Sequence, residues 1–204
     1  MLRLLGYLFA TGFVVFLGCV GAFAYIVWET SKTLPEYSQL AKYEPPVMSR
    51  VHAANGELLA EYANQRRLFV PVDAIPDRVI HAFLSAEDKN FFKHSGIDWR
   101  GIGRAAVNMG KGLLRGKRQL QGASTITQQV AKNFLLTSER TFDRKLKEAL
   151  LAQRIEQAFD KRKILELYLN EIYLGLGSYG VASASLSYFG KSLHELSLVE
   201  AAYL

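Results

Sequence analysis

The sequence predicts a mainly α-helical domain that follows one transmembrane helix and a small β-hairpin. Three observations carry this prediction. Residues Leu4 to Trp28 include no charged side chain, and an Asn55-Gly56 pair separates two apolar segments. Beyond Pro76, apolar residues return every three or four positions, which is the periodicity of an amphipathic helix. At 204 residues the chain has room for an anchor and one domain with a core of its own.

Residues 1–29 are expected to form a short cytoplasmic tail and a membrane anchor. The uncharged stretch exceeds the roughly 20 apolar residues that cross a bilayer. A cleaved signal peptide is the alternative, but its apolar region would run only about 7–15 residues. Arg3 precedes the span and Glu29 is the first charge after it. The positive-inside rule therefore places the N-terminus in the cytoplasm and the domain on the outer face of the membrane.

Residues 30–76 are expected to form a connector and a β-hairpin. Proline residues and weak periodicity from Thr30 to Pro46 are typical of a connector. Strands are predicted over Val47–Ala53 and Leu58–Tyr62, because the Asn-Gly pair between them supplies the positive φ angles of a tight hairpin turn. Leu68–Val72 is a candidate third strand.

Residues 77–204 are expected to form one helical domain, truncated at its C-terminal end. The predicted helices cover Asp77–Phe92, Trp99–Leu114, Thr125–Leu136, Ser138–Phe159, Lys161–Leu174 and Val181–Phe189. A Thr125-x-x-Gln128 capping box opens the third of them. A last segment opens with a Ser192-x-x-Glu195 box and is still periodic at Leu204, so we expect the sequence to be the N-terminal part of a longer protein.

The charge of the chain narrows the class of partner. Arg3 and Glu29 cancel, so the net charge of +6 belongs to the outer domain, which suits anionic lipid headgroups or a phosphorylated substrate. Nucleic acid is not expected, because the chain has no zinc-ligand spacing, RNA-binding aromatic signature or helix-turn-helix pattern. The single cysteine, Cys19, lies in the apolar span, which excludes cysteine chemistry from the domain.

Glu87 is the first candidate for catalysis. It follows Phe83 by four residues and precedes Phe91 by four, so helical spacing places it on the apolar face. Hydrophobic surroundings disfavour a charged carboxylate and raise its affinity for a proton, as a general base or acid requires. The alternative is a half-buried partner of a basic residue, and spacing alone does not separate the two. Asp88 and His94 accompany it; a lone histidine is more often a capping or packing residue.

Two further groups of polar residues are candidates for binding an anion. Gln128 and Lys132 lie one turn apart on one face of their helix, where a solvated lysine is the simpler interpretation. Arg140, Arg144 and Glu148 recur at intervals of four. They form either a surface ion-pair ladder or a site in which arginine forks bind phosphate and the carboxylate orients them or holds a divalent cation.

Five segments of the chain resemble, in order, the motifs of the glycosyltransferase domain (family 51) of class A penicillin-binding proteins. The segments are Glu87–Gly96, Gln121–Asn133, Arg144–Glu148, Lys163–Gly175 and Gly180–Lys191. The second is similar to its motif almost letter for letter. Together they cover nearly everything after Pro76, which is far more specific than one short motif. The segment Asn-Gly-Glu-Leu is also similar to the lead-in of two-domain members, in which a transpeptidase domain follows downstream.

The resemblance implies roles for the candidate residues. Members of the family polymerise lipid II into glycan strands, with inversion at the anomeric carbon and release of undecaprenyl pyrophosphate. Glu87 matches the general base, and Glu148 matches a second essential carboxylate near the leaving pyrophosphate. Lys132 and Arg140 match residues that hold its phosphates. Further positions expected to contact substrate are Asp88, His94, Ser124, Gln128, Asn133 and Arg144.

The resemblance also implies a fold and a setting. The expected fold is a lysozyme-like helical domain at the outer, or periplasmic, face of a bacterial plasma membrane. Lipid II, the nascent glycan strand and that membrane are the expected partners, with other cell-wall synthesis proteins as further candidates. No organic cofactor is expected, and a divalent cation (Mg²⁺ or Mn²⁺), with Glu148 as its candidate ligand, is left open.

Two other functions compete with polymerisation. A lytic transglycosylase or lysozyme has the same general shape but cuts glycan strands, and it has no pyrophosphate for Lys132, Arg140 and Arg144 to hold. A non-catalytic membrane scaffold would recruit partners through its basic surface. The clustered cations favour synthesis over the lytic reaction, whereas the scaffold predicts that Glu87→Gln leaves function intact.

Overall fold

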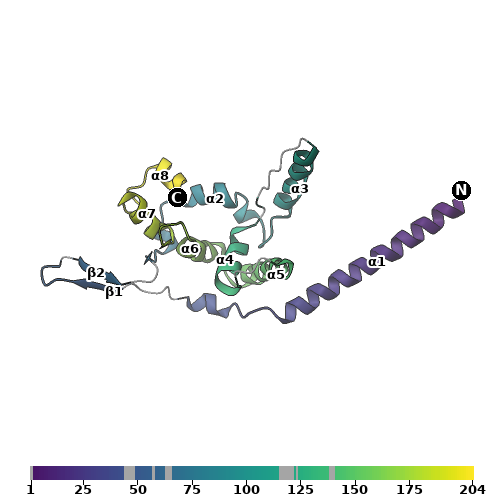
Figure 1. Cartoon of the computed structure of the whole chain (residues 1–204), viewed down its shortest axis with the longest axis horizontal. Coiled ribbons are helices and arrows are strands. Elements are labelled where there is room, and N and C mark those ends of the chain that lie inside the picture. Colours follow the sequence, from purple (N-terminus) through teal and green to yellow (C-terminus); the bar gives the residue numbers. More distant parts are fainter. Residues whose placement is uncertain are drawn as a thin grey trace.

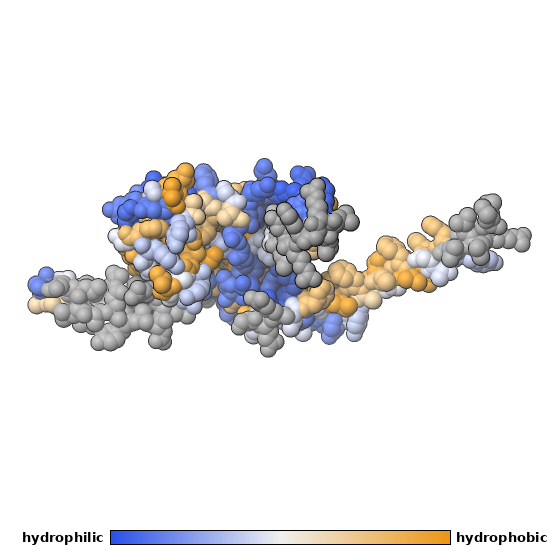
Figure 2. Space-filling view, turned by 45° about the horizontal axis from the view of Figure 1, so that its top comes forward, coloured by the Kyte–Doolittle hydropathy of each residue, from blue (hydrophilic) through white to orange (hydrophobic). Residues whose placement is uncertain are grey.

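A computed structural model of the chain describes residues 2–43, 49–56, 58–62, 66–114, 122, 124–137 and 141–204. Helix α1 (Leu2–Lys32) extends away from the helical domain (Figure 1). Its segment Phe9–Lys32 is long and apolar enough to cross a membrane, by length and composition. Figure 2 shows the apolar residues along it. The predicted apolar helix near the N-terminus is confirmed.

The end of α1 contacts the domain directly. Thr30 is buried, and the Arg154 Nη2 atom of helix α5 (Phe142–Ala158) donates to the Ser31 carbonyl oxygen at 3.3 Å. A 3₁₀ turn, η1 (Ser38–Lys42), follows and buries Leu40 in the hydrophobic core. Part of the expected connector is therefore packed against the domain that it joins to the anchor.

The predicted hairpin forms around the Asn-Gly pair, but of the two residues only Gly56 has the predicted positive φ, and the innermost paired residues are His52 and Leu58. Strands β1 (Ser49–His52) and β2 (Leu58–Tyr62) are antiparallel, with Ser49 opposite Tyr62. Gly56 has a φ of +85° and its N–H donates to the Ala53 carbonyl oxygen at 2.9 Å. Val47 and Met48, at the start of the first predicted strand, lie outside the described residues.

The prediction of a third strand over Leu68–Val72 is wrong. A shorter strand, β3 (Arg66–Arg67), lies before it and pairs in parallel with β4 (Ser178–Tyr179), far along the chain. Beyond β3, backbone N–H and carbonyl groups form hydrogen bonds with side chains instead of with a neighbouring strand. The Asn170 side chain accepts from the Val70 N–H and donates to the Val70 carbonyl, and the Glu166 carboxylate accepts from the Val72 N–H.

An ion pair fastens this lead-in to the helical domain. Arg67 pairs with Glu171 at the end of helix α6 (Lys161–Glu171), and both side chains are largely buried. Tyr43 donates to the same carboxylate at 2.8 Å. Burial and the neighbouring Glu171 raise the pKa of Tyr43 to about 12, so the phenol keeps its proton and remains a donor. The Arg67 guanidinium also lies over the Tyr179 ring.

Glu171→Gln is expected to lower the free energy of unfolding by about 3 kcal/mol, because it leaves the Arg67 charge buried without its anion. Chemical denaturation of the full chain in detergent measures the loss. Glu36→Gln, at an exposed glutamate outside this cluster, is the matched control. Equal stability of the two variants would contradict a stabilising role for the pair.

The helical part of the chain follows the predicted order with altered ends. The remaining helices are α2 (Asp77–Glu87), α3 (Trp99–Leu114), α4 (Ile126–Leu135), α7 (Val181–Phe189) and α8 (Leu198–Tyr203). Helices α3 and α7 have the predicted bounds. Helix α5 begins four residues later than predicted, with Thr141 as its N-cap; residues 138–140 lie outside the described part. Helix α6 ends at Glu171, three residues before its predicted end.

Helix α2 ends five residues earlier than predicted. The next residue, Asp88, has a φ of −155° and its carboxylate accepts from the Ile126 N–H at the start of α4. That contact draws the chain away from the helical path. Phe91 still reaches the core, from a separate 3₁₀ turn over Phe91–Lys93.

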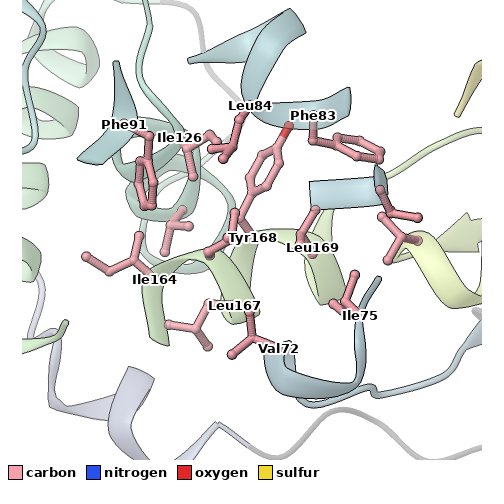
Figure 3. Close-up of a cluster of buried hydrophobic side chains, with 14 of the residues drawn as sticks. Val72, Ile75, Phe83, Leu84, Phe91, Ile126, Ile164, Leu167, Tyr168 and Leu169 are labelled. Carbon is pink, nitrogen blue, oxygen red and sulfur yellow. The ribbon is translucent and has the colours of Figure 1, made fainter. Parts of the chain in front are cut away.

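The last capping box was also placed too early. The Ser192 N–H donates to the Glu195 carboxylate, but the segment forms only a turn. A second box, Ser197 with Glu200, opens α8. The core runs between α2, α4 and α6, and Figure 3 shows its centre around Tyr168 and Leu169 of α6. Helix α4 packs on both α5 and α6. This packing fixes α4 against α5, and these two helices carry most of the polar candidates.

Candidate active site

Two adjoining hollows meet at the C-terminal end of α2. The larger, of about 570 Å³, lies between α4 and α5, and the smaller, of about 380 Å³, lies beside α3. Ala86, Glu87, Gly122 and Ser124 line both. Glu87 therefore stands where one hollow opens into the other.

Glu87 is exposed, so the prediction that it lies on the buried apolar stripe is wrong. Phe83 is buried as predicted, but α2 ends at Glu87 and Phe91 enters the core from a separate turn. The carboxylate is consequently not enclosed between apolar side chains of one helix. Its Oε2 atom accepts a hydrogen bond from Gln129 Nε2 of α4 at 2.8 Å. The group faces the cleft, within reach of a ligand.

Glu148 is a buried carboxylate in the lining of the larger hollow. Its side chain is 3 % exposed and lies between two cations of its own helix. Arg144 Nε lies 3.1 Å from Oε1, and Lys145 Nζ lies 2.6 Å from Oε2. Lys145 Nζ also donates to Ser124 Oγ at 2.9 Å. The sequence analysis missed Lys145, although it stands beside Arg144 in the same segment.

Cations dominate the larger hollow. Lys132 of α4 is exposed and lines it together with Arg144 and Lys145, and these three cations outnumber the carboxylates of Glu87 and Glu148 in the lining. This arrangement suits an anion with several oxygen atoms, because charge-assisted hydrogen bonds to phosphate are short and strong. Arg140 lies outside the described residues. Asn133 is exposed and lines neither hollow.

Gln128 and Gln129 form different hydrogen bonds, one within the helix cap and one to Glu87. Gln128 is buried, and its Oε1 atom accepts from the Thr125 N–H at 3.0 Å to close the predicted capping box. Gln129 reaches Glu87 instead, and sequence reasoning missed it. Its spacing of three from Lys132 was the available signal, since positions three apart share one helix face.

Asp88 and His94 form a buried pair beneath the smaller hollow. His94 Nε2 lies 3.0 Å from both carboxylate oxygens of Asp88. Asp88 also accepts from the Ile126 N–H at 3.1 Å and lines the hollow. Thr125 Oγ1 donates to the Gly96 carbonyl at 2.6 Å. These contacts fix the start of α4 against the loop that follows Glu87.

The smaller hollow contains polar residues that the sequence analysis did not identify. Asp98 accepts from Asn90 Nδ2 and from the Gly101 N–H, both at 2.9 Å, and lies 3.6 Å from Arg104. The Asn90 amide, followed by the Gly101 N–H, holds the pKa of Asp98 below its usual range. Asn108 of α3 lines the same wall. This hollow offers hydrogen-bonding groups of both kinds, as a sugar requires.

The described residues do not assemble a metal site around Glu148. Both of its oxygens face side-chain cations, and within the described ranges no group of three or more His, Cys, Asp or Glu side chains gathers. A divalent cation at Glu148 would have to replace Lys145, whose ammonium group lies 2.6 Å from the carboxylate. Among the described residues, the oxygens of Glu148 are therefore matched to side-chain cations.

Comparison with known proteins matches most of the chain to one protein family. Residues 55–204 match the family model described as Transglycosylase. Penicillin-binding protein 1A of Rickettsia felis is 50% identical over 94% of this chain and 24% of its own length. Penicillin-binding protein 1A of Aquifex aeolicus is 53% identical over 85% of this chain and 23% of its own length. The chain thus spans about a quarter of the curated relatives that it matches.

A solved structure also matches. The crystal structure of penicillin-binding protein 1A from Haemophilus influenzae is 26% identical, over 78% of this chain and 13% of that chain, with a TM-score of 0.34.

Proposed function

The chain belongs to the transglycosylase family, and from this premise we propose that it is a peptidoglycan glycosyltransferase that polymerises lipid II at a bacterial plasma membrane. The observation that carries the proposal is the exposed carboxylate of Glu87, placed where a hydrogen-bonding hollow opens into a cationic one. A base at that junction can act on an acceptor in one hollow while the other holds the departing phosphate.

In the proposed reaction the 4-hydroxyl of the acceptor lipid II attacks the anomeric carbon of the growing strand. Glu87 takes the hydroxyl proton as the new C–O bond forms. The bond from the anomeric carbon to undecaprenyl pyrophosphate breaks, and its electron pair leaves with the pyrophosphate. A single displacement of this kind inverts the anomeric centre. No organic cofactor is needed, because the pyrophosphate is already an activated leaving group.

Lys132, Arg144 and Lys145 support the departure of the pyrophosphate. Negative charge grows on its bridging oxygen in the transition state, and fixed cations lower the energy of that state most in a site with little water. We propose that Glu148 holds Arg144 and Lys145 in place for this purpose. Arg140 is proposed to contribute a further cation, as its family position implies.

The charges at the two ends of α1 support a location of the domain at the outer face of the membrane. With the Arg3 end in the cytoplasm, α1 would place the domain on the outer face, where the lipid-linked substrate and the nascent strand are expected. Other cell-wall synthesis proteins remain proposed partners.

Lipid II polymerisation by the full chain in detergent tests the proposal, with Mg²⁺, with Mn²⁺ and with a chelator in parallel. We expect glycan polymer and released undecaprenyl pyrophosphate. Release of fragments from finished peptidoglycan, with no polymer from lipid II, would favour the lytic alternative. The chelator arm reports whether a divalent cation takes part.

Lys132→Ala is expected to weaken binding of moenomycin, a mimic of the lipid-linked donor, by about tenfold or more, because one charge-assisted contact to phosphate is lost. Calorimetric titration measures the affinity. Lys147→Ala is the control, since Lys147 is on α5 but pairs with Asp143 outside both hollows. Equal affinity of both variants for moenomycin would exclude Lys132 from the donor site.

A further inference from the structure

The hydroxyl group of Tyr168 is buried beneath the cleft without a partner among the described residues. Tyr168 belongs to α6, is 1% exposed and is the largest fully buried side chain in the described part of the chain. Its ring lies edge-on to Phe83 of α2, with ring centroids 6.3 Å apart. A buried hydroxyl that makes no hydrogen bond destabilises a protein, and phenylalanine would fill the same space without that cost. Packing of the core therefore does not explain why a hydroxyl group is present at this position.

The hydroxyl points toward the helix that carries Glu87. In Figure 3 the Tyr168 ring rises from α6 and its oxygen ends beside Phe83 and Leu84. Glu87 follows those two residues by one turn. Helical side chains lean back over the turn that precedes them, so the carboxylate of Glu87 can reach the surface patch above the Tyr168 oxygen.

The proton stays on Tyr168 at neutral pH. Burial raises the pKa of the phenol above its ordinary value, and the negative charge of Glu87 raises it further. The phenol therefore stays protonated and can donate a hydrogen bond.

We propose that Tyr168 is a positioning residue for Glu87, whose carboxylate exchanges between the Gln129 amide in the cleft and the Tyr168 hydroxyl beneath it. The inference rests on the proposed role of Glu87 as the base. Both donors favour the charged carboxylate. Tyr168 thereby offers the carboxylate a donor when a substrate displaces Gln129.

Other charged groups line the two hollows together with Glu87. From α4 and α5 they are Lys132, Arg144, Lys145 and Glu148. From α3 and the loop after α2 they are Asp88, Lys89, Asp98 and Arg104. Replacing Tyr168 with Phe alters none of them, so a changed titration of Glu87 in that variant reports the hydroxyl.

Tyr168→Phe and Tyr188→Phe form a matched pair of variants. Tyr188 lies on α7, and its hydroxyl donates to the Leu174 carbonyl at 2.7 Å, away from both hollows. In Tyr168→Phe we expect the acid limb of the pH–rate profile for lipid II polymerisation to move to higher pH by about 0.5 to 1, because a donor to the carboxylate is lost. Tyr188→Phe should keep the wild-type profile. Its melting temperature should fall, whereas that of Tyr168→Phe should not.

A second measurement does not depend on activity. Carbon-13 NMR of the glutamate carboxyl groups in the full chain, with the Glu87 signal assigned by its loss in Glu87→Gln, follows the Glu87 titration directly. The midpoint should rise in Tyr168→Phe and stay constant in Tyr188→Phe. If the wild type fails to polymerise lipid II, the proposed function fails, and this titration still decides the role of Tyr168.

An unchanged Glu87 midpoint in Tyr168→Phe overturns the proposal. A lower melting temperature of Tyr168→Phe with an unchanged midpoint would identify the hydroxyl as a structural group with a buried partner such as water.

Discussion

Glu87→Gln is expected to reduce the rate of lipid II polymerisation by about 10²- to 10⁴-fold, the range that a positioned general base contributes. Glutamine has the size of glutamate and can still face Gln129, but it cannot accept the proton of the attacking hydroxyl. Lipid II should therefore still bind. Initial rates of polymer formation and equilibrium binding of lipid II, measured on the same preparation, separate the two effects.

The control for Glu87→Gln is Glu195→Gln. Glu195 is exposed, and its carboxylate accepts from Ser192 in a turn away from both hollows. It loses the same charge and should polymerise at the wild-type rate. Turnover by Glu87→Gln at the rate of this control would remove Glu87 from the mechanism and favour a non-catalytic scaffold.

Glu148→Gln is expected to cause the second largest loss, of about 100-fold or more in polymerisation, which is the effect of removing one preorganised electrostatic element. The amide cannot balance Arg144 and Lys145, so both cations lose the positions that they hold in the structure. The variant should also unfold more readily, by about 3 kcal/mol, because a buried pair is broken.

Stability and catalysis can be separated by comparison with Glu171→Gln. That variant also breaks a buried glutamate–arginine pair, but at the lead-in, outside both hollows. Assayed well below both melting temperatures, Glu171→Gln should polymerise like the wild type and Glu148→Gln should not. Equal rates would make Glu148 a structural residue only.

Local signals in the sequence predicted the helical elements well. The Thr125 capping box and the Asn55-Gly56 turn depend on residues within four positions of one another. The box forms as expected, and the hairpin turns at the predicted place, although Asn55 does not take the predicted positive φ. The early end of α2 was not predictable in the same way. It depends on Asp88 meeting the Ile126 N–H, a contact across 38 positions that helical periodicity does not report.

Contacts between residues far apart in the sequence also explain why the candidate site was only partly predictable. Spacing placed Glu87 on an apolar face because Phe91 was counted on the same helix, and the structure exposes Glu87. The pairing of Arg144 with Glu148 was predictable, since it lies within one turn. Contacts of Gln129 with Glu87 and of Lys145 with Ser124 join separate elements, and only the packing of α2, α4 and α5 brings them together.

The junction between α1 and α5 has a consequence for how substrates are found. Thr30 and Ser31 contact the domain on the helix that carries Glu148, so no long free tether separates the anchor from the cleft. With α1 in a bilayer, the cleft is confined to a thin layer above the lipid headgroups. The proposed lipid-linked substrate would then meet it by lateral diffusion within a plane, so collision frequency would depend on surface density and not on bulk concentration.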